Sequence, residues 1–300
     1  EFFKEVIQMA ITASQVKELR QSTGAGMMEC KKALQEAKGD IEEAENLLRV
    51  KSGSKASKVA GRVAAEGAVG VNISSDKKIG ALVEINCETD FVGKDESFKG
   101  FVTQVAQLVV ENQIKEISGL GEIDVNGESL EVIRQKLVMR LGENITWRRV
   151  ALVKAKGALN YYVHGGRIGV LVDIEGGDNE LQKDLAMHIA AMRPVAVSSD
   201  GIPPDLIDRE GQIARDRALE SGKNPDIVEK IVEGTIKKYL SDVTLLGQSF
   251  VKNDKQSVGQ LVKGLNAKVH GFNLFIVGEG IEKKSADFVA EVKAQASKMQ

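Results

Sequence analysis

The sequence has few of the residues on which most metal and redox sites depend. Its 300 residues include only two cysteines, three histidines and one tryptophan. Cys30 and Cys87 are too few for a disulfide framework, and neither has the Cys-x-x-Cys or Cys/His spacing of a zinc site. The sequence therefore predicts two buried thiols, with no bound metal and no cofactor.

Catalytic motifs and membrane segments are missing as well. The phosphate-binding Gly-x-x-x-x-Gly-Lys-Ser/Thr, the Gly-x-Ser-x-Gly elbow and His-Glu-x-x-His do not occur. No apolar run approaches the roughly 18 residues that span a bilayer. The net charge of -2, with both signs mixed, excludes a bulk basic surface for nucleic acid and leaves only local patches open. We therefore expect a soluble, intracellular protein without covalent chemistry, membrane attachment or direct nucleic-acid binding.

The length predicts several modules rather than one core. Residues 1–8 precede Met9 and are interpreted as residues added for expression or as an upstream extension. Residues 9–50 contain three short helical patterns with Thr, Ser or Asp at their starts, so a three-helix module is expected. Its core would be marginal alone. Residues 51–62, rich in Lys, Ser, Gly and Ala, predict a linker.

An internal repeat organises the middle of the chain. Residues 78–85 (KIGALVEI) and 167–174 (RIGVLVDI) match position by position, and an amphipathic helical pattern follows each. This predicts an α+β fold with two related subdomains and antiparallel sheets, at 63–158 and at 159–201 with 247–281.

Two further elements are expected outside this core. Residues 202–246 predict an antiparallel helical hairpin (a coiled coil) with a thin apolar seam, which would project and either pair with a second copy in a homodimer or contact a partner. Residues 282–300 predict a terminal helix, which would need a docking surface because a short helix is marginal alone.

The two repeat copies differ in the connection between strand and helix. The second copy uses only EGGD, whereas the first inserts NCETDFVGKD, which places Phe91 beside Asp90. Packing of the shared unit does not require this Asp-Phe tip. Two interpretations carry nearly equal weight: Phe91 contacts another molecule, or it folds back into its own core.

Smaller features favour structural roles. The Thr-Gly-Ala-Gly at 23–26 lacks the Lys and Ser/Thr of a nucleotide loop and predicts a turn. Met27 and Met28 are adjacent on a helix, so one is expected in the core and the other free for an adaptable contact. His188 lies at core spacing, and His164 precedes a Gly-Gly turn and is expected to be exposed.

The chain closely resembles bacterial elongation factor Ts. The resemblance covers nearly everything from Met9 onward, and its most specific feature is Thr-Gly-x-Gly-Met-Met-x-Cys-Lys-Lys-Ala-Leu together with Thr-Asp-Phe-Val. The segments that carry it are ITASQVKELRQSTGAGMMECKKALQEAKGDIEEA, ALVEINCETDFVGKD, LGENITWRRV, VHGGRIGVLV and VGEGIEKKSADFVAEV.

The resemblance implies a fold and a function. It implies a ubiquitin-associated-like (UBA-like) module, a two-part α+β core, a helical hairpin and a C-terminal helix. It also implies a guanine-nucleotide exchange factor in translation elongation, acting on GDP-bound and nucleotide-free elongation factor Tu. The Thr-Asp-Phe-Val segment, implicated in dislodging the magnesium ion of that GTPase, falls on Thr89, Asp90, Phe91 and Val92. Other partner contacts fall on Arg20, Met27, Met28, Leu141, Gly142 and His164, with Leu141 replacing a common family Ile.

Two other functions compete with this expectation. A protein-binding adaptor or chaperone-like scaffold would form complexes without changing nucleotide release. An enzyme with an acid site at Glu88, Asp90 and Asp95 would need an organised base and nucleophile, which the sequence does not contain.

Overall fold

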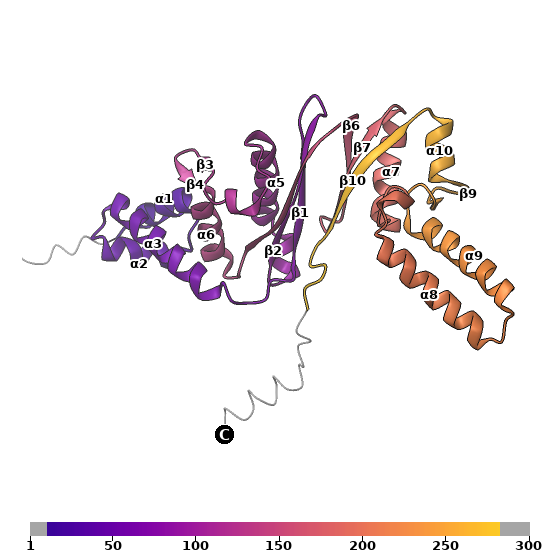
Figure 1. The fold of residues 1–300 in the computed structure, drawn as a ribbon. Helices are drawn as coiled ribbons and strands as arrows, with labels where there is room; N and C mark the ends of the chain where they lie inside the picture. Colours follow the sequence, from indigo (N-terminus) through magenta and orange to yellow (C-terminus); the bar gives the residue numbers. More distant parts are fainter. Residues whose placement is uncertain (1–10, 283–300) are drawn as a thin grey trace, which may run out of the picture.

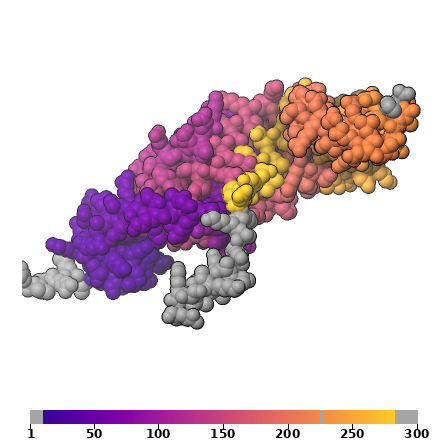
Figure 2. All heavy atoms as spheres, turned by 60° about the horizontal axis from the view of Figure 1, so that its bottom comes forward, coloured from indigo at the N-terminus to yellow at the C-terminus, as the bar shows by residue number. Residues whose placement is uncertain are grey.

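The computed structural model describes residues 11–282, apart from the side chains of residues 225 and 226. The predicted extension at 1–8 and all but the first residue of the predicted terminal helix at 282–300 lie outside this range. The described part is elongated, with the N-terminal helices at one end and a helical hairpin at the other (Figures 1 and 2).

Three helices form the N-terminal module: α1 (Ala13–Thr23), α2 (Met27–Glu36) and α3 (Ile41–Val59). Thr12 caps α1 in a reciprocal pair with Gln15, and the Asp40 carboxylate accepts a hydrogen bond from the third residue of α3. These caps satisfy backbone N–H groups that a helix start leaves unpaired, so the predicted helix starts are confirmed.

Helix α3 is longer than the sequence suggested, which corrects the predicted linker at 51–62. Residues 51–59 are its second half, and Ala56 and Val59 are buried in the core of the first subdomain. Here α3 packs against α6 (Leu130–Leu141). The small residues that suggested a flexible segment instead allow two helices to approach closely.

The small core of the module is completed by a residue from α6. Met139 packs with Leu19, Leu48 and their neighbours and is 4% exposed. Met27 and Met28, which were predicted to divide between core and surface, are both exposed, at 59% and 63%. The module therefore depends on the next subdomain for part of its core.

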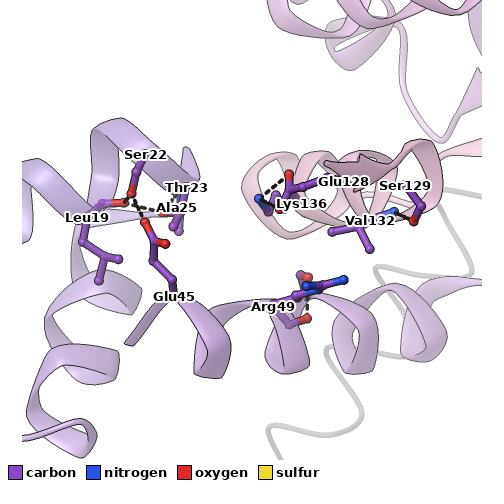
Figure 3. A network of polar contacts seen from close by, with 11 residues as sticks. Leu19, Ser22, Thr23, Ala25, Glu45, Arg49, Glu128, Ser129, Val132 and Lys136 are labelled. Atoms are coloured by element: carbon purple, nitrogen blue, oxygen red, sulfur yellow. Dashed lines mark hydrogen bonds and ion pairs between the residues drawn. The ribbon is translucent and has the colours of Figure 1, made fainter. Parts of the chain in front are cut away.

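The remaining contact between module and α6 is polar and hollowed (Figure 3). Ser22 and Glu45 are hydrogen-bonded on the module side, and Lys136 forms an ion pair with Glu128 on the opposite side, 2.6 Å apart. Arg49 lies between them along the hollow. The apolar contact at Met139 and the shared helix α3 therefore hold the module.

The core contains two three-stranded antiparallel sheets, ordered β1-β2-β5 and β10-β7-β6. The strands are β1 (Glu66–Ile73), β2 (Ile79–Cys87), β5 (Thr146–Lys154), β6 (Ala158–His164), β7 (Ile168–Glu175) and β10 (Lys268–Ile276). The repeat copies form the central strands β2 and β7. The predicted α+β class with duplicated antiparallel units is confirmed.

Helices cover the outer face of each sheet. Helix α5 (Glu96–Glu111) packs on the first sheet, and α7 (Asn179–Met192) packs on the second. The Asp95 carboxylate caps α5 by accepting the backbone N–H groups of Ser97 and Phe98. The shorter elements are η1 (Ile117–Gly119), β3 (Asp124–Val125), β4 (Glu128–Ser129), η2 (Ser199–Gly201), β8 (Ser249–Phe250), β9 (Asn253–Ser257) and α10 (Val258–Gly264).

The repeated Ile-Gly-x-Leu pattern serves the contact between the two sheets. Leu82 and Leu171, at equivalent repeat positions, are buried in one cluster with Val69, Phe275 and Val277. A Cβ added to the repeat glycine Gly169 would lie 2.4 Å from a Val69 side-chain carbon. The glycine is therefore required by the close approach of the sheets.

The repeated acidic residue is buried in both copies. Glu84 is 1% exposed; its carboxylate accepts a hydrogen bond from Arg149, at 2.6 Å, and from the Gly278 N–H, at 2.8 Å. Asp173, in the second copy, accepts the backbone N–H groups of two residues that lead into β6. Each carboxylate thus fixes a chain segment at the border of its sheet.

The hairpin consists of α8 (Pro204–Glu220) and α9 (Pro225–Val243). Its seam is built from Ala214, Ala218, Val228 and Val232, so small residues allow close packing. Ile227, directly before Val228 on α9, is 49% exposed. The hairpin projects from the second subdomain (Figure 1).

His188 is a core residue, as its spacing indicated. It is fully buried on α7, where Nδ1 accepts the Val251 N–H (3.2 Å) and Nε2 donates to Gln248 Oε1 (3.0 Å). Burial lowers the pKa of His188 below its ordinary 6.5, and the Gln248 hydrogen bond only partly opposes that shift. The neutral ring therefore holds α7 against the segment that follows the hairpin.

We expect this histidine to make stability pH-dependent. Below about pH 6.5 the unfolded chain binds a proton that the folded chain does not, so the free energy of unfolding falls with pH until the lowered folded-state pKa is reached. Above pH 6.5 the stabilisation is fully present. Urea unfolding between about pH 7.5 and about pH 5.5 measures the effect.

A matched pair of variants isolates the contribution of His188. The His188→Gln variant should be less stable at neutral pH and should have a flatter pH profile than the parent. His164→Gln, which changes an exposed ring, should keep the parent profile. An unchanged slope in His188→Gln would assign the dependence to other groups.

Within the described residues, no helix is both long and apolar enough to cross a membrane.

Candidate functional site

The Asp-Phe tip is a five-residue helix, α4 (Asp90–Lys94), that the sequence pattern did not reveal. The ring of Phe91 is 81% exposed, whereas the next side chain, Val92, is 8% exposed and belongs to the core of the first subdomain. The interpretation that Phe91 folds back into its own core is therefore wrong. A large apolar ring stands in solvent on a short, anchored helix.

The start of α4 is fixed by backbone and side-chain hydrogen bonds. Thr89 is its N-cap, and the hydroxyl oxygen accepts the Val92 N–H at 3.4 Å. The buried Cys87 thiol donates to the Thr89 carbonyl at 3.1 Å. Burial and the nearby carboxylates of Glu143 and Glu66 raise the pKa of Cys87 to about 12. This thiol is a structural donor and not a nucleophile.

Asp90 stays on the surface of α4. Its carboxylate forms an ion pair with Lys94 at 2.6 Å, one turn later, and this hydrogen bond lowers the pKa of Asp90. The residue is therefore ionised at neutral pH and already bonded within its own helix. A single carboxylate of this kind is a poor competitor for magnesium, which favours octahedral oxygen coordination.

A second segment holds the tip from the side. The carboxylate of Glu143, which follows the C-cap glycine of α6, accepts hydrogen bonds from the backbone N–H groups of Glu88 and Thr89 and from the Thr89 hydroxyl. Glu143 is not among the residues predicted from the sequence. Its only local signal is an acidic residue directly after a Gly that ends a helix, which does not specify a distant partner.

The predicted contact at His164 lies on a tight turn. His164 ends β6 and is exposed, and Gly165 and Gly166 follow it with positive φ of 57° and 71°. Tyr162 stacks beside the imidazole, and its hydroxyl lies 3.1 Å from Nδ1. The Gly166 carbonyl accepts the Val69 N–H at 2.8 Å, so this turn is fastened to the first sheet.

The remaining predicted contacts occupy two places. Arg20, Met27 and Met28 are exposed on the N-terminal module. Leu141 ends α6 with its side chain partly buried in the core, and Gly142 is the C-cap, with φ of 81°. Gly142 leads directly to Glu143, so this pair is joined to the tip of α4.

Neighbouring hollows relate these places to one another. One is lined by the α1–α2 turn at residues 22–24 together with Ser97 and Arg140, which brings the module next to the start of α5. Another lies between α4, at Asp90 and Lys94, and the turn at residues 165–167. The structure therefore brings α4 close to the turn that follows His164, whereas Arg20, Met27 and Met28 line neither hollow.

The acid site weighed as an alternative is not organised for catalysis. Glu88 accepts the Asn144 N–H at 2.6 Å, Asp90 is paired with Lys94, and Asp95 caps α5. Each carboxylate has a structural partner, and none is bonded to another of the three. Among residues 11–282 no group of three or more His, Cys, Asp or Glu is arranged to hold a metal ion.

Comparison with known proteins decides the family. The model of the family described as Elongation factor TS matches residues 88–279. Elongation factor Ts of Nitrosospira multiformis is 58% identical over 289 residues, which cover 95% of this chain and 96% of that protein. The chain belongs to the elongation factor Ts family. The factor of Nitrosomonas eutropha is 55% identical over 288 residues (96% and 98%), and that of Methylobacillus flagellatus is 54% identical over 286 residues (95% and 98%).

The extent of each match matters for the site. The elongation factor Ts model begins at Glu88, so it includes α4, the Gly142–Glu143 segment and the His164 turn. The three-helix module lies before residue 88, outside the region that the family model matches. The near full-length relatives cover 95% or more of the chain, so membership in the elongation factor Ts family rests on both the core and the whole chain.

Proposed function

We propose that this chain is the guanine-nucleotide exchange factor of elongation factor Tu and that α4 carries the exchange step. The exposure of Phe91 is the observation that supports this proposal most directly. The ring is 81% exposed beside a buried Val92, and an exposed apolar ring on an anchored helix is typical of a protein-binding site. An adaptor without exchange activity would also use an exposed ring for binding, so the rate of GDP release decides between the two functions.

The exchange step follows from how such GTPases hold GDP. Backbone N–H groups surround the phosphates, and a magnesium ion bridges phosphate and protein oxygens. A ring inserted between side chains that support the ion would displace them and leave the phosphate charge less compensated. Thr89 and Val92 would hold α4 in place, and Asp90 would bond the partner or the helix without chelating the ion.

The binding energy would come from surfaces away from the nucleotide. Met27 and Met28, both exposed, suit an adaptable apolar contact. Arg20 beside them, the Leu141–Gly142 segment and His164 would add further contacts. Binding of the GTPase and displacement of its nucleotide would thus rest on different surfaces, and no covalent step occurs in the factor.

Exchange of this kind is thermodynamic linkage. If the factor weakens GDP binding, GDP weakens factor binding by the same ratio, and each tenfold of antagonism requires about 1.4 kcal/mol of coupling. The factor would therefore bind the nucleotide-free GTPase more tightly than the GDP-bound form. As a translation factor it would act in the cytoplasm. Pairing of two copies through α8 and α9 stays a prediction.

The direct test loads purified elongation factor Tu with fluorescent GDP and follows its release against excess unlabelled GDP. The parent protein should accelerate release in proportion to its concentration until the complex saturates. Complex formation without acceleration would identify an adaptor and would overturn the proposal.

A further inference from the structure

Glu143 holds the segment that leads into α4 through several hydrogen bonds, and this support of the Phe91 helix was not predicted from the sequence. One carboxylate oxygen accepts the Glu88 N–H at 3.1 Å and the Thr89 N–H at 2.9 Å, and the other accepts the Thr89 hydroxyl at 2.5 Å. Hydrogen bonds to a charged acceptor are shorter and stronger than neutral ones. A single side chain thus satisfies three donors from two consecutive residues.

The contact is reciprocal. The Glu88 carboxylate accepts the Asn144 N–H at 2.6 Å and also pairs with Arg62 at 3.4 Å. The Asn144 side chain, 2% exposed, donates to the carbonyl oxygens of Ala60 and Arg62, just beyond the end of α3. Residues 88–89 and 143–144 therefore hold each other through four hydrogen bonds and are fastened to the chain that leaves the N-terminal module.

The bonds reach Phe91 through the start of α4. The Thr89 hydroxyl that donates to Glu143 also accepts the Val92 N–H and caps the helix. A helix of five residues has almost no stability of its own, because nucleation outweighs the few hydrogen bonds it forms. Besides the packing of Val92 in the core, the residue that starts α4 sets the direction of the helix, and Glu143 fixes that residue.

We propose that Glu143 is a positioning residue for exchange, which sets the direction of the Phe91 ring and joins the Leu141–Gly142 contact to it as one rigid unit. The inference rests on the proposed function. Glu143 itself would contact neither nucleotide nor magnesium, and we expect its effect on GDP release to pass through Phe91.

The test replaces the carboxylate with an amide of the same shape. Glu143→Gln loses acceptor capacity, and its NH2 group opposes the donors of residues 88 and 89. We expect the maximal acceleration of GDP release to fall about tenfold while the concentration for half-maximal effect changes little, since a loss of pre-organisation acts on the displacement step. Glu131→Gln, which changes a half-buried carboxylate bonded to Arg134 on α6, should keep the parent exchange rate.

A double variant shows whether the effect passes through the ring. In a Phe91→Ala background, Glu143→Gln should cause no further loss, because residues that act as one unit are non-additive. A full additional tenfold loss in that background, or parent-like exchange by Glu143→Gln alone, would overturn the inference. If Glu143→Gln does not fold, Thr89→Val removes the hydroxyl that joins Glu143 to the start of α4, and unchanged amide protection at Val92 in that variant would overturn the inference without involving the partner.

Amide hydrogen exchange separates this inference from the proposed function. The N–H groups of Glu88, Thr89 and Val92 should exchange about tenfold faster in Glu143→Gln than in the parent, as expected when a local hydrogen-bonded unit opens more often. Unchanged protection would refute the positioning role even in an active factor. Faster amide exchange in Glu143→Gln, together with a parent protein that does not accelerate GDP release, would mean that the proposed function is wrong and that the contact of Glu143 with α4 is not.

Discussion

The Phe91→Ala variant should bind elongation factor Tu nearly as well as the parent and lose most of the acceleration of GDP release. The ring is 81% exposed, so its removal leaves no cavity in the free protein, and Val92 still anchors α4. Burial of a Phe side chain contributes about 1.5–3 kcal/mol, which corresponds to a rate loss of about tenfold to hundredfold if the contact forms only during displacement.

The measurement compares two quantities for each variant: the dissociation constant for the nucleotide-free GTPase and the maximal rate of fluorescent GDP release. Leu265→Ala, which truncates an exposed apolar side chain in the second subdomain, is the control and should match the parent in both. An equal loss of affinity and rate in Phe91→Ala would contradict the division between binding and displacement.

The Arg149→Ala variant should have a much lower free energy of unfolding than the parent, and the loss should exceed that of the other single substitutions proposed for this protein. Glu84 is 1% exposed, and Arg149 is the side chain that neutralises it; the guanidinium also lies 4.3 Å from the Phe275 ring centre and donates to the Ile276 carbonyl. Its removal leaves a buried carboxylate with only the Gly278 N–H. Breaking a buried pair costs about 3–5 kcal/mol, and partial exposure of Arg149 favours the lower end.

Urea unfolding measures this loss, and two further variants identify its cause. Arg148→Ala removes the neighbouring guanidinium, which donates to the Glu279 carbonyl at the surface, and should cost under about 1 kcal/mol. The double variant Glu84→Leu with Arg149→Ala should recover part of the stability, because no charge is left unpaired. If the double variant is as unstable as Arg149→Ala, lost packing on Phe275 rather than the unpaired charge is responsible.

Local patterns predicted the elements whose physics is local. Thr12, Asp40 and Asp95 cap helices because their side-chain oxygens reach backbone N–H groups two or three residues away. The repeat at residues 78–85 and 167–174 predicted two central strands, because both copies meet the same inter-sheet contact. The motif Thr-Asp-Phe-Val indicated the family and the position of the tip.

Predictions that depended on distant neighbours were less successful. Residues 51–59 have linker composition, yet α6 provides a surface on which small side chains pack. Met27 and Met28 were assigned partly to the module core, but Met139 from α6 fills that core and leaves both exposed. Composition describes a segment without its neighbours, and these neighbours are some 80 to 110 residues away in the chain.

By itself, the sequence determined the family, the α+β class and the repeat, because each is encoded in residue patterns that can be recognised without knowing which distant segments come into contact. Only the tertiary structure decided that the Phe91 ring points into solvent and that Glu143 holds the helix beneath it. The contact of Glu143 consists of hydrogen bonds with residues 88 and 89, which lie more than 50 positions earlier in the chain. A carboxylate has no directional signature in sequence, so its partners are known only once the chain has folded around it.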